Sequence, residues 1–76
     1  MKSLDSLHTG ERGVISSLEG GEKFLSRATA MGFTPDTDVS VIRNGRRGPL
    51  IVSLRDTEVA IGRGEAEKIS VREVGV

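Results

Sequence analysis

The chain has 76 residues, no cysteine, and 11 basic residues balanced by 11 acidic ones, which gives a formal net charge of zero. The absence of cysteine argues against the disulfide-rich class of small secreted proteins, so we expect a cytoplasmic location. The longest apolar stretch, PLIV at residues 49–52, is far shorter than the ~20 residues of a membrane helix. Balanced charge and only two aromatic residues argue against nucleic-acid binding.

The first third of the chain predicts a helical turn followed by a strand. Leu4 and Leu7 lie three residues apart, which suits one turn of α- or 3₁₀-helix at the edge of a core. Residues 13–18 form a β-prone run in which Ile15 faces inward, whereas Leu18 faces outward unless a bulge shifts the register. The glycines at 20 and 21 then break the chain.

A helix is predicted over residues 22–31, because apolar side chains recur there at helical spacing. They are Phe24, Leu25, Ala28 and Met31. Phe24 and Leu25 are adjacent and cannot both point fully inward, so we expect one of them on an exposed apolar patch. Most of this apolar face is expected to cover the core of so small a protein.

A sharp corner follows the helix in the sequence MGFTPDT, residues 31–37. Gly32 supplies the left-handed residue that ends helices, and Phe33 can then pack back onto Ala28. The residue before a proline is extended, so the helix cannot resume, and Pro35 with Asp36 fits the centre of a β-turn. The predicted role of this corner is architectural.

The second half of the chain predicts four further strands and a short helical turn. The strands span residues 38–43, 49–54 and 57–62, and a helical turn within 63–69 leads into a last strand at 69–74. The inward residues are Val39, Val41, Leu50, Val52, Leu54, Val59, Ile61, Ile69 and Val71. The loop NGRRGP, residues 44–49, includes a second structural turn at Gly48 and Pro49. We predict one mainly β domain over residues 1–76: a small five-stranded SH3-like barrel with one inserted helix.

Several of these motifs together resemble the FeoA family of small accessory proteins of bacterial ferrous iron uptake. The matching features include the MGFTP corner, GP at residues 48–49, and VAIGRGEAEKI at residues 59–69. Two departures are Asp36, where a glycine is common, and the lighter, alanine-containing helix FLSRATAM. Either change could alter the surface that the helix offers to a partner, but neither affects the fold prediction.

The resemblance implies a cytoplasmic protein that acts on FeoB, a membrane ferrous iron transporter with a cytoplasmic GTPase domain. Contact with the membrane is then expected only through this partner. The same barrel occurs at the C-terminus of iron-dependent repressors, but 76 residues leave no room for a helix-turn-helix domain. An alternative is a regulatory barrel that binds a divalent metal ion, weakly, or a nucleic-acid phosphate. The oligomeric state stays open.

Catalytic and metal sites have little support in the sequence. His8 is the only histidine and has no cysteine to pair with, so we expect a solvated imidazole rather than a catalytic base. The carboxylate pairs Glu65 with Glu67 and Asp36 with Asp38 fall short of a full metal shell. We therefore predict a non-enzyme without a cofactor, a catalytic residue or a metal site.

Partner binding is the remaining hypothesis for the functional residues. The helix and its corner are the first candidate surface, and the arginine pair in the loop is the second, because arginines hold carboxylates and phosphates well. The candidate residues are Phe24, Leu25, Arg27, Met31, Phe33, Arg46 and Arg47.

Overall fold

The computed structural model describes residues 2–45 and 47–74. Its elements are β1 (Lys2–Ser3), the 3₁₀ turn η1 (Leu4–Ser6), β2 (Arg12–Leu18), α1 (Glu22–Met31), β3 (Asp38–Arg43), β4 (Leu50–Leu54), β5 (Thr57–Ile61), α2 (Arg63–Ala66) and β6 (Ile69–Glu73). The predicted fold class is confirmed: a mainly β protein with a helix after the first long strand and a helical turn before the last. The short strand β1 was not predicted.

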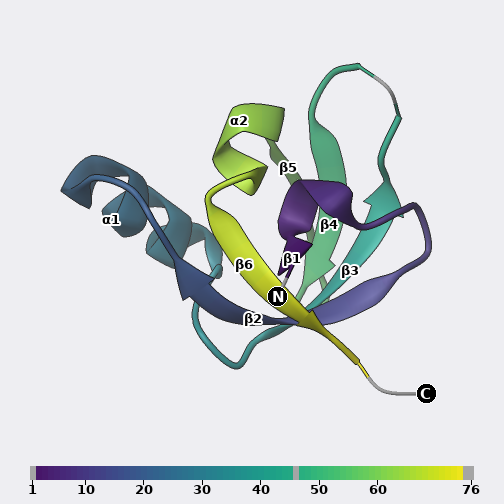
Figure 1. The fold of residues 1–76 in the computed structure, drawn as a ribbon, viewed down its shortest axis with the longest axis horizontal. Coiled ribbons are helices and arrows are strands. Elements are labelled where there is room, and N and C mark those ends of the chain that lie inside the picture. Colours follow the sequence, from purple (N-terminus) through teal and green to yellow (C-terminus); the bar gives the residue numbers. More distant parts are fainter. Residues whose placement is uncertain (1, 46, 75–76) are drawn as a thin grey trace.

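The strands form one antiparallel sheet in the order β1-β6-β2-β3-β4-β5. This sheet curls around the core, and α1 projects to one side (Figure 1). Its two edge strands lead directly into η1 and α2, and these two helical segments contact each other. Within the described residues, helical turns rather than paired strands therefore close the barrel.

The core contains the side chains that helical spacing and strand alternation predicted to face inward. Leu4, Leu7 and Ile15 are completely buried, and the inward valines and leucines of β3 and β4 are at most 2% exposed. Two barrel positions, Val59 and Leu18, are half-buried against this core. The fold thus confirms the hydrophobic pattern on which the sequence prediction rested.

Two irregularities in the sheet change the facing of side chains. Between Ile15 and Ser17 the register of β2 against β6 shifts, and Leu18 pairs with Ile69 and packs on the core. This is the bulge that the sequence analysis left open. A second shift, between Val41 and Arg43 in β3, was not anticipated. Bulges re-aim side chains next to them, so both positions affect what the surface offers.

Candidate functional site

Helix α1 contributes four of the predicted partner residues, and the structure divides them by exposure. Phe24 is 6% exposed and belongs to the core, whereas Leu25 and Met31 are half-buried and packed against it. Of the adjacent pair Phe24 and Leu25, Leu25 is therefore the residue that remains partly at the surface. Arg27 is exposed, but it forms an ion pair with Glu65 of α2. Its positive charge is thus already matched within the protein.

The beginning of α1 is fixed to the barrel through Phe24. The ammonium of Lys68 lies 5.1 Å from the centre of the Phe24 ring. Gly20 approaches the ring so closely that a Cβ atom there would lie 2.8 Å from Phe24 Cδ2. A side chain at residue 20 would therefore push against the aromatic ring that anchors the helix.

The corner after α1 has the predicted geometry. Gly32 has φ 107°, its N–H donates to Thr29 O, and the N–H of Phe33 donates to Ala28 O. These two bonds define a Schellman cap. Phe33 is completely buried, so this predicted partner residue is a core residue and is not accessible to a partner.

The turn at Pro35 and Asp36 is confirmed by a hydrogen bond from Thr37 N–H to Thr34 O. Asp36 has φ 69°, the left-handed conformation that a type II turn needs at its third residue. Its carboxylate also pairs with Arg72, with 3.3 Å between Oδ1 and Nη2. The corner is thus tied to the last strand of the sheet.

The loop of residues 44–49 is anchored at its base by the side chain of Asn44. Its Nδ2 donates to the carbonyl oxygens of Asp5 and Leu7, at 3.0 and 2.6 Å. Its Oδ1 accepts from Arg63 Nη2 at 2.8 Å, and Arg63 also donates to Gly45 O. This junction joins η1, the loop and α2, three parts of the chain that are distant in sequence.

The tip of the same loop is exposed. Arg47, Gly48 and Pro49 are exposed, and Gly48 has φ 82°, which fits the predicted structural turn. Arg46, a predicted partner residue, lies outside the described residues. Arg43, which the sequence analysis did not single out, is exposed on β3 just before the loop.

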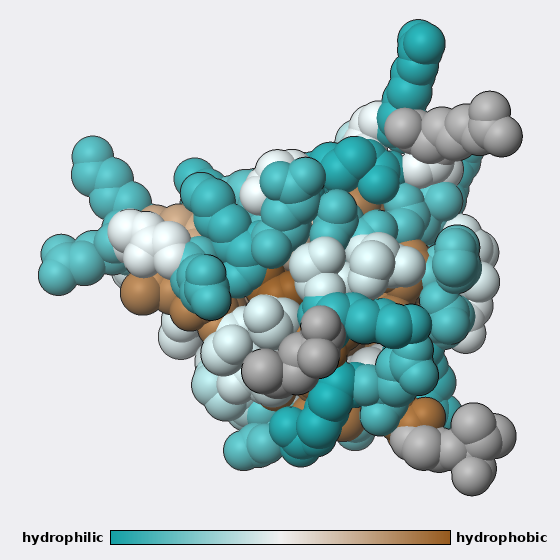
Figure 2. Space-filling model, in the orientation of Figure 1, coloured by the Kyte–Doolittle hydropathy of each residue, from teal (hydrophilic) through white to brown (hydrophobic). Residues whose placement is uncertain are grey.

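The structure does not bring the two predicted partner groups together. Figure 1 places α1 at one end of the longest axis and the loop between β3 and β4 towards the other end. Hydrophobic side chains reach the surface near α1 in Figure 2, whereas hydrophilic side chains project around the loop. One flat partner surface would therefore meet only one of the two groups.

His8 is exposed and pairs with Glu11. Its Nδ1 lies 3.0 Å from Glu11 Oε1, and its backbone N–H donates to the same oxygen at 2.6 Å. This backbone hydrogen bond, followed by the side-chain contact and the charge of His8, lowers the pKa of Glu11 below its ordinary value. The pairing was not predicted, and it leaves the imidazole with a carboxylate neighbour rather than a nucleophile.

One carboxylate of each pair considered as metal ligands is engaged elsewhere. Glu65 pairs with Arg27, and Asp36 pairs with Arg72. Within residues 2–45 and 47–74, no group of three or more His, Cys, Asp or Glu side chains gathers in a way that could hold a metal ion.

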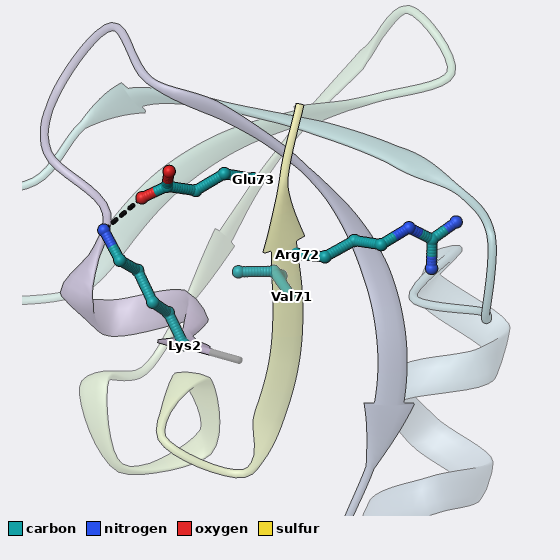
Figure 3. A pocket seen from close by; sticks show the side chains of 4 residues that line it. All are labelled: Lys2, Val71, Arg72 and Glu73. Atoms are coloured by element: carbon teal, nitrogen blue, oxygen red, sulfur yellow. Dashed lines mark ion pairs between the residues drawn. The ribbon is translucent and has the colours of Figure 1, made fainter. Parts of the chain in front are cut away.

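A shallow hollow of about 290 Å³ lies beside β6 and is lined by Lys2, Val71, Arg72 and Glu73. Figure 3 shows Lys2 and Glu73 reaching toward each other as an ion pair, while Arg72 extends to the other side of the strand. The hydrogen bond to Glu73 and the charge of that carboxylate raise the pKa of Lys2 above its ordinary value. The charges in this hollow thus satisfy each other.

No helix in the described part of the chain is both long and apolar enough to span a membrane. The profile of the FeoA domain family matches residues 2–73. The chain belongs to the FeoA family. A curated relative, an Fe(2+) transport protein A of Methanocaldococcus jannaschii, is 36% identical to this FeoA-family chain over 64 residues, covering 84% of the chain and 77% of the relative.

A second relative combines two proteins in one polypeptide. It is the Fe(2+) transport protein A/Fe(2+) transporter FeoB fusion protein of Porphyromonas gingivalis, 35% identical over 69 residues. The match covers 90% of this FeoA-family chain but only 8% of the fusion protein.

Solved structures agree with the family assignment. A crystal structure of an iron uptake regulatory protein, FeoA, superimposes with a TM-score of 0.91 and 29% identity, covering 95% of this chain and 96% of that one. FeoA of Stenotrophomonas maltophilia, a prokaryotic SH3-domain protein complexed with zinc, superimposes with a TM-score of 0.80 and 24% identity. This match covers 93% of this chain and 89% of that one. A manganese-dependent transcriptional repressor superimposes with a TM-score of 0.88 and 19% identity, covering 96% of this chain and 41% of that one. The fold is therefore SH3-like.

Proposed function

We propose that this FeoA-family chain is a non-catalytic cytoplasmic accessory protein of ferrous iron uptake. It docks on the cytoplasmic GTPase part of a FeoB-type transporter and modulates it. The observation that carries the proposal is the relative from Porphyromonas gingivalis, in which a matching segment and a transporter form one polypeptide. A fusion of this kind supports physical association, because it holds the two parts at high effective concentration.

The geometry supports a binding role rather than a chemical one. The only histidine, His8, is paired with Glu11, and in the shallow hollow beside β6 Lys2 is paired with Glu73. Catalysis by a side chain generally requires a nucleophile or base placed against a substrate cavity. The described surface instead offers exposed apolar and basic side chains, which suit contact with a protein.

The docking residues that we propose form two alternative surfaces, because one flat partner surface would meet only one of them. The helix surface comprises Leu25, Arg27 and Met31, with buried Phe24 and Phe33 supporting it from below. The loop surface comprises Arg46 and Arg47. Because the two surfaces lie at different ends of the molecule, substitutions can test them independently.

A direct test titrates the whole chain against the isolated cytoplasmic region of the FeoB-type transporter from the same genome, with and without guanine nucleotide. Saturable binding is expected, and deletion of the gene should reduce ferrous iron uptake. Failure to bind at high micromolar concentrations, together with unchanged uptake in the deletion strain, would contradict the proposal.

The repressor structure favours one alternative, a regulatory barrel that binds a divalent ion or a nucleic-acid phosphate. At 19% identity, that likeness supports only the fold. Equilibrium dialysis with ferrous and zinc ions, and DNA binding at several salt concentrations, separate the two candidates. One-to-one metal uptake, or a steep salt dependence of DNA binding, would favour the alternative.

A further inference from the structure

Positive charge is concentrated in the hairpin formed by β3, the following loop and β4. Residues 39–55 contain four arginines, at positions 43, 46, 47 and 55, and no aspartate or glutamate. Because the whole chain is neutral, the remainder carries an excess of acidic residues. The molecule is therefore electrically asymmetric despite its zero net charge.

Arg43 and Arg47, at the loop end of this hairpin, form no ion pair with a carboxylate of the described residues. The ion pairs of the described residues join Lys2 with Glu73, His8 with Glu11, Arg27 with Glu65, and Arg72 with Asp36. None of these involves Arg43 or Arg47. Arg55 lies at the opposite end of β4, where its Nη2 is 3.4 Å from the hydroxyls of Thr34 and Thr37. Arg43 and Arg47 thus belong to none of the ion pairs of the described residues, and both lie at the loop end.

The β-bulge in β3 places an apolar side chain beside this charge. Val41 pairs with Val52 and the next pair is Arg43 with Ile51, so Ile42 is the extra residue of the bulge. The side chain of Ile42 is large, hydrophobic and 45% exposed, which sets it apart from the other large hydrophobic side chains of the described residues. Both residues of a bulge oppose a single partner residue, which brings Ile42 and Arg43 together across from Ile51.

The sheet extends this apolar area across the neighbouring strands. Ile51 is half-buried and pairs with Ala60 of β5, which is exposed. We call the set Ile42, Arg43, Arg47, Ile51 and Ala60 the hairpin face. It combines apolar side chains with the guanidinium groups of Arg43, in the bulge, and of Arg47, in the loop that follows; such a composition is typical of protein interfaces.

We propose that the hairpin face is the docking surface of the protein and that it binds an acidic segment of the partner. The inference rests on the proposed function, because the partner is the cytoplasmic region of the transporter. Guanidinium groups bind carboxylates through two parallel hydrogen bonds, so unmatched arginines fit an acidic protein surface. Ile42 supplies the apolar contact that excludes water from these pairs.

The hairpin face suits a protein better than a membrane or a nucleic acid. Membrane surfaces are recognised by clusters of about four to eight basic residues, whereas the loop end carries three arginines. Single-stranded nucleic acids require aromatic stacking platforms, and both phenylalanines of the chain are buried. On α1, Arg27 is already paired with Glu65, so that surface offers no unmatched guanidinium group.

The test compares single charge reversals at equivalent exposed positions. Arg43→Glu and Arg47→Glu change the hairpin face, and Lys23→Glu changes an exposed cation of α1 by the same charge. Each variant is titrated against the isolated cytoplasmic region of the transporter, with circular dichroism as the check on folding. We expect each hairpin reversal to weaken binding about tenfold, since opposing like charges are costly, and Lys23→Glu to leave it unchanged.

A second arm tests the apolar contact and the salt dependence. Ile42→Ser should weaken binding about fivefold without changing the effect of salt, because it removes only apolar contact area. Wild-type affinity should fall as salt rises, and this dependence should diminish in Arg43→Glu. Equal loss of affinity in Arg43→Glu and Lys23→Glu, with no salt dependence, would overturn the inference.

The outcomes separate this inference from the proposed function. If the wild-type chain does not bind the transporter region at all, the proposed function fails. If it binds and the hairpin reversals have no effect, only the hairpin inference fails. Saturable binding to anionic vesicles, duplex DNA or a second copy of the chain that Arg43→Glu abolishes, without an effect on transporter binding, would assign the hairpin face to that other occupant and overturn the inference.

Discussion

At the scale of single residues, Asn44 has the widest set of contacts described outside the core. One carboxamide binds two carbonyl oxygens of the N-terminal segment and one guanidinium of α2, and the backbone N–H of Asn44 donates to Thr9 Oγ1 at 2.9 Å. The Nε atom of Arg63 is buried without a partner in the described structure. The junction therefore depends on Asn44 to hold Arg63 in place.

We predict that Asn44→Ala lowers the free energy of unfolding by about 2 kcal/mol, because it leaves part-buried carbonyl groups and the Arg63 guanidinium unsatisfied. Urea denaturation followed by circular dichroism measures the change. Ser26→Ala, on the exposed side of α1, is the control and should stay within about 0.5 kcal/mol of wild type. Equal stability of wild type and Asn44→Ala would show that the junction does not stabilise the fold.

The pairing of Glu11 with His8 predicts a small dependence of stability on pH. The pKa of Glu11 is lowered in the folded protein, so its ionised form stabilises the fold above the unfolded-state pKa. This contribution is lost as the pH falls through the folded-state pKa. Wild type should therefore be more stable than Glu11→Gln at pH 7, and the difference should shrink towards pH 3.

Thermal unfolding at several pH values measures this difference, with Glu58→Gln as the matched variant of an exposed carboxylate on β5. A difference between wild type and Glu11→Gln that stays constant from neutral to acidic pH would show that the carboxylate charge is not responsible.

At the scale of elements, the attachment of α1 is the feature most open to test. The two glycines before the helix have different roles. Gly20 has φ 142° and is close to the Phe24 ring, whereas Gly21 has φ −75° and open space around its Cα. An alanine therefore fits at residue 21 but not at residue 20.

We predict that Gly20→Ala lowers the free energy of unfolding by about 2 kcal/mol, through backbone strain and pressure on Phe24. Gly21→Ala should change it by no more than about 0.5 kcal/mol, because an ordinary backbone conformation and free space accept the methyl group. Chemical denaturation of both variants provides the measurement. Similar values for the two glycines would contradict the close packing of α1 on the barrel.

Elements with strong local signals could be predicted from the sequence. The bounds of α1 and its glycine cap follow from apolar spacing and a single Gly-Phe pair, and the alternation in β4 fixes which residues face inward. Strand β1 has two residues and no alternation to detect. It exists because Lys2 and Ser3 pair with Val71 and Ser70, a long-range contact that no local pattern contains.

The candidate site was less predictable for the same reason. Arg47 could be chosen from its loop, but Ile42 looked like the outer residue of a regular strand. Only the pairing of Arg43 with Ile51 reveals the bulge that brings Ile42 beside the arginines. Phe24 and Phe33 were candidates because they belong to the helix and its corner, yet a chain of this size needs them in its core.

At the scale of the whole molecule, the two ends differ in the charges that they offer to a partner. One end carries α1, whose arginine is paired internally, and the other carries a hairpin with unmatched arginines around an exposed isoleucine. Association steered by such a field depends on ionic strength and orients the approaching partner. The whole molecule would then present the hairpin, rather than the helix, to the transporter.

The most direct measurement maps this contact by NMR, with ¹⁵N-labelled protein titrated with the unlabelled cytoplasmic region of the transporter. We predict amide shift changes concentrated at Ile42, Arg43, Arg47, Ile51 and Ala60, with the amides of Ser26 and Ala30 in α1 unaffected. Changes confined to α1, or no changes at concentrations well above micromolar, would contradict this prediction.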